Sequence, residues 1–195
     1  MSKYLKEFWF DKRILFLACA SIFYAAIVIG TPYSKWMWTA LVGGIALFFV
    51  AEYFIHRFAL HGFISSVMPN AHKGHEEHHN HPNNNEFLLT PNAYNVPVHF
   101  ALSVLFIILF QSYHLGFAVM LGFGAYQLFY EWTHFVSHRP IIPWTPWGKW
   151  MKKHHLLHHY KDEAHYFGVT HPAFDMLLGT DHSLVNVDGK KKAEL

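Results

Sequence analysis

Histidine is the residue type whose number and spacing in this sequence most clearly predict chemistry. Ten of the 18 histidines fall into four short groups along the chain. The groups are His56 with His61, His75 with His78 and His79, His134 with His138, and His155 with His158 and His159. Because imidazole is the commonest protein ligand for metal ions, four such groups predict a metal centre.

The spacing within the groups indicates helices. Residues three or four positions apart share a face of an α-helix, so each group with this spacing is expected to direct its nitrogens to one point. His56 and His61 are five positions apart, which suits one helical face poorly. We expect a helix end there, where the chain can turn the second ring inward.

The other eight histidines lack this spacing. His72, His81 and His154 lie beside the groups and are interpreted as surface residues or as residues that support the ligands. The isolated histidines are interpreted as surface or hydrogen-bonded residues; they are His99, His114, His165, His171 and His182.

Two carboxylates accompany the histidines. Glu52 precedes His56 by four residues, and Glu131 precedes His134 by three. Each lies at the end of an apolar run, where an unpaired charge is costly. We expect each carboxylate to accept an imidazole N–H and so orient the ligand. The alternative is direct ligation, since Glu131 and His134 match the Glu-x-x-His pattern of di-iron helix bundles.

Four apolar runs must position these groups. They cover residues 14–30, 37–55, 96–110 and 115–132, and they are nearly free of charge. About 17 to 25 such residues cross the hydrocarbon core of a membrane. The sequence therefore predicts an all-α integral membrane protein with about four transmembrane helices. The third run has only 15 residues, so the third and fourth runs could form a shallow hairpin with its tip at residues 111–114.

Basic residues predict the orientation in the membrane. If the four runs cross alternately, 14 of the 15 Lys and Arg residues lie on one face and only Lys35 lies on the other. By the positive-inside rule that face is cytosolic, with both termini. The grouped histidines then belong to a cytosolic helical cap.

Composition excludes several other classes. The net charge of +2 and the lack of a basic stretch interleaved with aromatic residues argue against nucleic-acid binding. Cys19 is the only cysteine, which excludes internal disulfides and thiolate metal clusters. At 195 residues, the chain is expected to form one domain over 1–195.

The four histidine groups, in this order, resemble the fatty acid hydroxylase and sterol desaturase superfamily. The resemblance covers about residues 52–180, and it is most similar to the fatty acid 2-hydroxylase branch. The stretches that carry it are EYFIHRFALH at 52–61, YEWTHFVSH at 130–138, HLLHHYK at 155–161 and FGVTHPAFDMLLGT at 167–180.

The resemblance implies a dimetal oxygenase. All ten grouped histidines would be metal ligands, with two non-haem iron ions as the cofactors, and zinc could occupy the same site in purified samples. The protein would use O2 to hydroxylate an acyl chain, at C2 of a fatty acid or fatty-acyl lipid. An electron-transfer domain fused to many relatives is not recognisable here, which implies a separate donor, either cytochrome b5-like or a ferredoxin with its reductase. The location implied is a bacterial plasma membrane, or the endoplasmic reticulum in a eukaryote.

Two other functions are also compatible with the sequence. A sterol or carotenoid hydroxylase or desaturase of the same superfamily would use similar histidine motifs. A membrane metal-ion transporter, from a different class, also places histidines on membrane helices, but its site should lie near the middle of the bilayer.

Overall fold

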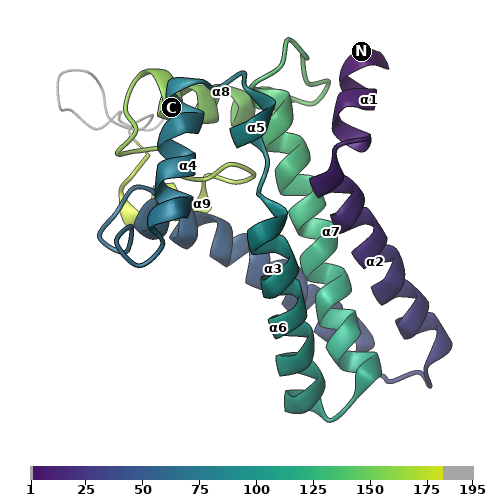
Figure 1. The fold of residues 1–195 in the computed structure, drawn as a ribbon. Coiled ribbons are helices and arrows are strands. Elements are labelled where there is room, and N and C mark those ends of the chain that lie inside the picture. The colour runs from purple at the N-terminus through teal and green to yellow at the C-terminus, as the bar shows by residue number, and fades with distance from the viewer. Residues whose placement is uncertain (1, 182–195) are drawn as a thin grey trace.

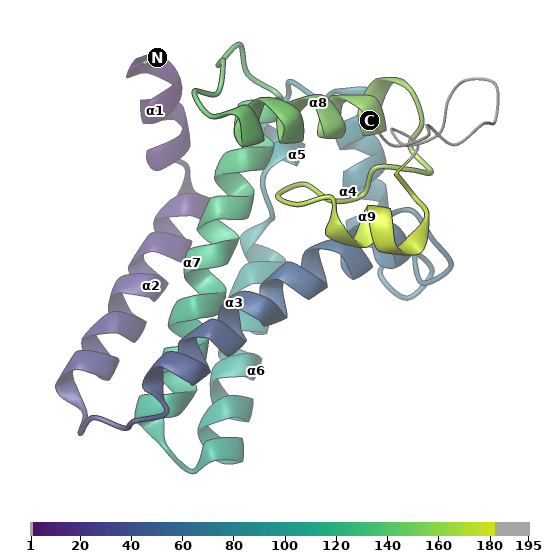
Figure 2. The same ribbon diagram turned by 180° about the vertical axis from the view of Figure 1, so that it is seen from behind.

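The structure is a computed structural model that describes residues 2–181. It is helical, with no strand in that range. In chain order the helices are α1 (Ser2–Trp9), α2 (Lys12–Gly30), α3 (Met37–Phe54), the π-helix η1 (Ile55–Leu60), α4 (Pro69–Asn80), α5 (Asn85–Leu88), α6 (Asn92–Phe110), α7 (Tyr113–Ser137), α8 (Pro146–Tyr160) and α9 (Ala173–Leu178). Four long helices, α2, α3, α6 and α7, form a bundle, and the short helices gather at one end of it as a cap (Figures 1 and 2).

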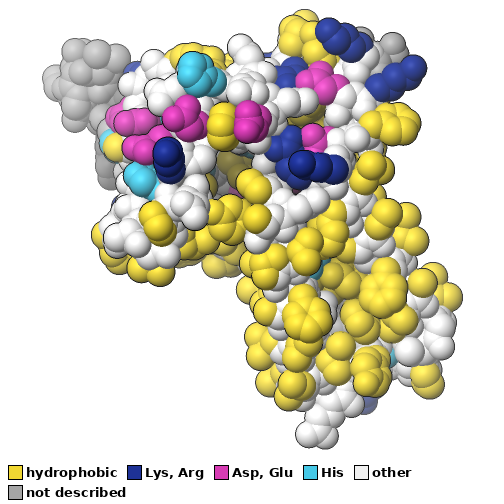
Figure 3. All heavy atoms as spheres, in the orientation of Figure 1, with side chains coloured by type: hydrophobic (Ala, Val, Ile, Leu, Met, Phe, Trp, Pro, Cys, Tyr) yellow, Lys and Arg dark blue, Asp and Glu magenta, His cyan; other side chains and the backbone are white. Residues whose placement is uncertain are grey.

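The bundle has the surface of a membrane protein. Within residues 2–181, three helical segments are long and apolar enough to cross a membrane: Lys12–Gly30, Met37–Leu60 and Asn85–Phe110. Only 28%, 17% and 11% of their apolar windows, respectively, is buried inside the protein. Hydrophobic side chains cover the bundle, and charged side chains gather on the cap (Figure 3). The chain is therefore a multi-pass membrane protein.

Helix α7 contains the fourth apolar run but is not one of these three segments. It packs against α2, α3 and α6 at the centre of the bundle. Polar side chains such as Gln127 and Glu131 are buried in it. Because neighbouring helices rather than lipid surround α7, it needs less apolar surface than the outer helices.

The predicted hairpin of the third and fourth runs is present, but it is not shallow. Helix α6 starts at Asn92 rather than Val96 and has 19 residues. At about 1.5 Å per residue this length nearly matches the hydrocarbon core. Gln111 ends α6 in the left-handed conformation (φ 48°), and Ser112 caps α7 by accepting a hydrogen bond from the Leu115 N–H.

Two glycines allow α3 and α7 to approach each other closely. A Cβ atom on Gly44 would lie 1.9 Å from the Val119 carbonyl oxygen, and one on Gly122 would lie 2.0 Å from that of Leu41. Small residues permit such backbone contact between membrane helices. This contact fixes the two helices whose ends carry His56 and His134.

Arg13 has a structural role in addition to its contribution to the charge difference between the two ends of the bundle. Its side chain is 8% exposed. It forms an ion pair with Asp11 at 2.7 Å and donates to the carbonyls of Asn85 and Glu86 at 2.7 and 2.9 Å. The start of α2 is thereby tied to α5, which leads into α6.

Candidate metal centre

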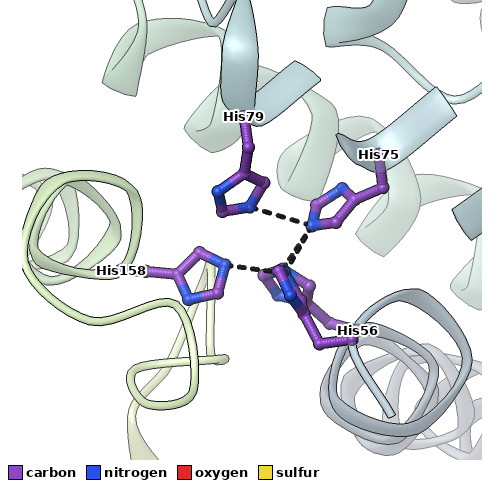
Figure 4. A group of neighbouring side chains, drawn as sticks. His56, His75, His79 and His158 are labelled. Atoms are coloured by element: carbon purple, nitrogen blue, oxygen red, sulfur yellow. Dashed lines mark hydrogen bonds between the residues drawn. The ribbon is translucent and has the colours of Figure 1, made fainter. Parts of the chain in front are cut away.

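The structure brings all ten grouped histidines together as two sets of five. Within each set the candidate ligand atoms all lie within 4.8 Å of one another. The first histidine group consists of His56, His61, His75, His79 and His158, and the second histidine group of His78, His134, His138, His155 and His159. Figure 4 shows four members of the first group pointing toward one another from three parts of the chain.

The three-histidine motifs divide between the groups, contrary to the expectation that each aims at one point. On α4, His75 and His79 join the first group and His78 joins the second. Successive residues of an α-helix are rotated by about 100°, so positions i and i+4 point in more similar directions than positions i and i+3. Helix α8 repeats the division in reverse, since His155 and His159 join the second group and His158 the first.

The five-residue spacing of His56 and His61 follows from η1. A π-helix has i→i+5 hydrogen bonds, and the His61 N–H donates to the His56 carbonyl at 3.2 Å. Residues five apart therefore stack along one face, so both rings reach the first group. The prediction of a helix end that turns the second ring inward is confirmed, since η1 ends at Leu60 and His61 is its C-cap. The π-helix itself was not predicted. Short π-helices occur often at functional sites.

Burial keeps the imidazoles neutral. It lowers the pKa of His75 and His155 well below the usual value, and neighbouring imidazoles lower it further. Burial likewise lowers the pKa of His78 to about 2 and that of His61 to about 3. A neutral imidazole has the free lone pair that a metal ligand needs.

The geometry is compatible with a metal in each group. His75 Nε2 lies 3.1 Å from that of His56 and 2.8 Å from that of His61. Nitrogens about 2.0–2.1 Å from one ion and at right angles to each other would be roughly 3 Å apart. In the second group, both ring nitrogens of His159 are buried without a hydrogen-bond partner among residues 2–181. A metal ligand bond would satisfy one of these otherwise costly polar atoms.

Neither predicted carboxylate–imidazole hydrogen bond is present in the described structure. Both Glu52 carboxylate oxygens accept from the Thr170 hydroxyl at 2.8 Å. Glu131 accepts from the Thr90 N–H at 3.3 Å. Each carboxylate therefore holds a nearby loop rather than a histidine.

Backbone carbonyls, rather than the two carboxylates, accept hydrogen bonds from the imidazoles. His56 donates its Nδ1–H to the Phe167 carbonyl at 2.7 Å, and His158 donates to the His165 carbonyl at 2.8 Å. The Leu88 backbone hydrogen-bonds His134. A hydrogen bond at Nδ1 fixes the tautomer and leaves Nε2 free to bind a metal. Every residue has a backbone carbonyl, so the residue types in the sequence could not indicate which carbonyls accept from the histidines.

The remaining histidines lie outside both groups. His154 is buried and donates to Asp175 at 3.1 Å, so it is a supporting residue. His99 and His114 are hydrogen-bonded within the bundle. His182 lies outside the described residues.

A cavity of about 260 Å³ connects the bundle with both groups. His56 and His75 of the first group and His134 of the second line it. Most of the remaining lining is apolar and includes Phe48 and Val98 from membrane-spanning segments. A ligand with an apolar chain could thus reach both histidine groups from the level of the membrane.

The fold and site together define an all-helical, multi-pass membrane protein with a histidine-rich centre compatible with metal binding. The family model of the fatty acid hydroxylases matches residues 40–180, which is most of the chain. The chain belongs to the fatty acid hydroxylase family.

Curated relatives agree with this membership. The chain is 27% identical over 194 residues to the ceramide very long chain fatty acid hydroxylase scs7 of Schizosaccharomyces pombe, covering 93% of this chain and 53% of the relative. It is 27% identical over 190 residues to the dihydroceramide fatty acyl 2-hydroxylase FAH2 of Arabidopsis thaliana, covering 89% and 77%. The chain thus spans about half the length of the first relative.

A solved structure shares the fold. Full-length Scs7p, of which only the hydroxylase domain is visible, matches with a TM-score of 0.72 at 24% identity, over 85% of this chain and 64% of that chain. The named relatives come from a fission yeast and a plant, so they give no support to the expected bacterial membrane.

Proposed function

We propose that this protein hydroxylates the acyl chain of a fatty acid or fatty-acyl lipid at C2. The observation that carries the proposal is the cavity that joins apolar, membrane-level side chains to both histidine groups. The relatives named as fatty acyl hydroxylases support the same reaction. An acyl chain could enter from the bilayer while its carbonyl end stays near the cap.

We propose that the ten grouped histidines are the ligands of two iron ions, five to each ion. Bound iron would supply the redox chemistry of O2 activation, which zinc lacks because it does not change oxidation state. The reaction balances when one oxygen atom enters a C–H bond and the other leaves as water. Two electrons and two protons are consumed in each turnover.

The protein's own side chains would position the substrate and exclude water. Phe48, Val98 and Phe123 give the cavity its apolar wall. The Tyr130 hydroxyl makes no hydrogen bond within the described residues, and its ring lies 5.9 Å from that of His134. It is therefore available to donate to the acyl carbonyl, which would place C2 beside the histidines.

The electron donor would be a separate protein that approaches the cap. Apart from Lys35, the basic residues of the described chain belong to the cap or to the bundle end next to it (Figure 3). The positive-inside rule then supports a cytosolic cap and a cytosolic N-terminus. We propose a cytochrome b5-like protein or a ferredoxin with its reductase as the donor. The membrane would be the endoplasmic reticulum in a eukaryote.

The alternatives receive less support. The named relatives are fatty acyl hydroxylases rather than sterol or carotenoid enzymes. A transporter site near the middle of the bilayer is also disfavoured, because both groups involve the cap helices α4 and α8.

Iron analysis and reconstitution together test the proposal. The purified protein should contain two non-haem irons per chain and should be inert with O2 and lipid alone. Adding a reductase and a small electron carrier should yield 2-hydroxyacyl product. The proposal fails if fully iron-loaded protein with a competent donor forms no such product from fatty acids, acyl thioesters or ceramides.

A further inference from the structure

One loop supports the first histidine group from behind. The segment 165–170, which we call the carbonyl loop, follows α8. Its His165 and Phe167 carbonyls accept the Nδ1–H groups of His158 and His56 at 2.8 and 2.7 Å. Two of the five imidazoles in this group therefore have their tautomer and orientation fixed by one short backbone segment.

Asp175 holds the carbonyl loop in place. This carboxylate is fully buried, at 0% exposed. Its Oδ1 accepts from the Phe167 N–H at 2.8 Å and from the Thr180 hydroxyl at 2.7 Å. Its Oδ2 accepts from the Gly168 N–H at 2.7 Å and from His154 Nε2 at 3.1 Å. Four hydrogen bonds converge on one carboxylate, and two of them come from the loop backbone.

The loop conformation needs this support. Tyr166 lies between the two residues whose carbonyls accept from the histidines, and it has a φ of 62°, in the left-handed region that non-glycine residues rarely adopt. Such a conformation persists only when its surroundings hold it. The Tyr166 N–H donates to the Thr180 carbonyl at 3.0 Å, so the segment around Asp175 fixes the loop at this point as well.

The second histidine group lacks an equivalent arrangement within the described residues. The Nδ1 atoms of His78, His155 and His159 are buried there without a hydrogen-bond partner. Backbone support is limited to the bond between Leu88 and His134. The orientation of these rings is set by packing more than by hydrogen bonds.

We infer that the two groups bind metal unequally, the first more tightly than the second, and that Asp175 is the positioning residue responsible. The inference rests on the proposed metal ligands but not on the proposed reaction. Supporting hydrogen bonds of this kind typically change metal affinity about 10- to 100-fold. Asp175 touches none of the ten histidines directly and acts through the carbonyl loop.

Equilibrium zinc binding tests the inference. Zinc is redox-inert and accepts imidazole ligands. The full chain in detergent, stripped of metal, is titrated with Zn²⁺ against a chelator of known affinity. Wild-type protein should show two dissociation constants at least about tenfold apart. His159→Ala should remove the weaker site, and His79→Ala should remove the tighter one. A single dissociation constant for two zinc ions, or the reverse assignment, overturns the inference.

Asp175→Asn isolates the role of the carboxylate. Asparagine can still accept at Oδ1, but its NH2 group would face the Gly168 N–H. The tighter site should weaken about 10- to 100-fold and the weaker site should stay unchanged. Equal weakening of both sites, or of neither, in folded protein contradicts the role of Asp175.

Thr180→Val provides a second variant if Asp175→Asn does not fold. It removes one of the four hydrogen bonds to Asp175, so it should weaken the tighter site in the same direction but less. No change at that site counts against the inference. If zinc binds as expected but the iron-loaded protein with a competent donor forms no 2-hydroxyacyl product, the proposed function is refuted and this inference stands.

Discussion

At the scale of the residue, the sequence identified the histidines that the structure brings together better than it identified the residues that support them. The ten histidines stand out because repeated imidazoles at helical spacing are typical of a metal centre. Glu52 stood out for its position but was assigned the wrong partner, since it binds Thr170. Asp175 lies in a motif used for the resemblance, but its role depends on the contact between the carbonyl loop and His56, which are far apart in the sequence. Such a contact leaves no local pattern in the sequence.

Substitutions at Glu52 separate its charge from its hydrogen bonds. Glu52→Gln keeps an oxygen that can accept from Thr170, so fold and zinc binding should change little. Glu52→Leu leaves the buried Thr170 N–H without its partner and limits the Thr170 hydroxyl to its hydrogen bond with Tyr126, which should cost about 1–3 kcal/mol of stability. Thermal unfolding in detergent measures the difference. If both variants lose the same amount of stability and both lose metal, the Glu52 carboxylate acts on a histidine or a metal, as we expected from its position in the sequence.

At the scale of the element, spacing predicted helices but not their irregularities. The i, i+4 pairs His75/His79 and His155/His159 each remain together, while His78 and His158 point to the opposite groups. Which helix faces which partner is a tertiary property, so the sequence could not divide the ten histidines into two sets. The π-helix η1 could be suspected only from a spacing that fits no α-helical face.

Neighbouring glycines on α3 test the close contact with α7. A Cβ on Gly44 would meet the Val119 backbone, whereas one on Gly43 would have nothing within 4 Å. Gly44→Ala should therefore destabilise the protein by about 1–3 kcal/mol or more through overpacking. Gly43→Ala should be neutral or slightly stabilising, because alanine is the better helix former. Equal melting temperatures for the two variants would show that the helices do not approach as described.

At the scale of the whole molecule, the apolar pattern predicted the architecture well. Three of the four predicted runs lie in segments suited to crossing a membrane. The fourth run is surrounded by the other three helices. The mean hydropathy of a segment cannot distinguish a helix that faces lipid from one that faces other helices. The length of α6 was also underestimated, because the helix begins at Asn92, before the apolar run that starts at Val96, and includes two asparagines there.

Cysteine labelling tests the orientation. Cys19 is the only native cysteine, so Cys19→Ala provides a background for single replacements. Glu76→Cys on the cap should react with a membrane-impermeant maleimide only from the cytosolic side. Ser34→Cys, next to Lys35 at the opposite end of the bundle, should react only from the other side. Labelling of both positions from the same side would rule out the proposed topology.

The position of new oxygen in cellular lipids tests the central claim most directly. Cells that express the wild-type protein with a matching electron donor are grown under ¹⁸O2, and released acyl chains are analysed by mass spectrometry. His158→Ala serves as the inactive variant, and His81→Ala, at an exposed residue outside both groups, as its control. We expect ¹⁸O-labelled 2-hydroxyacyl chains with wild type and His81→Ala, and none with His158→Ala. A new double bond, or an oxidised sterol or carotenoid with unchanged acyl chains, would contradict the account.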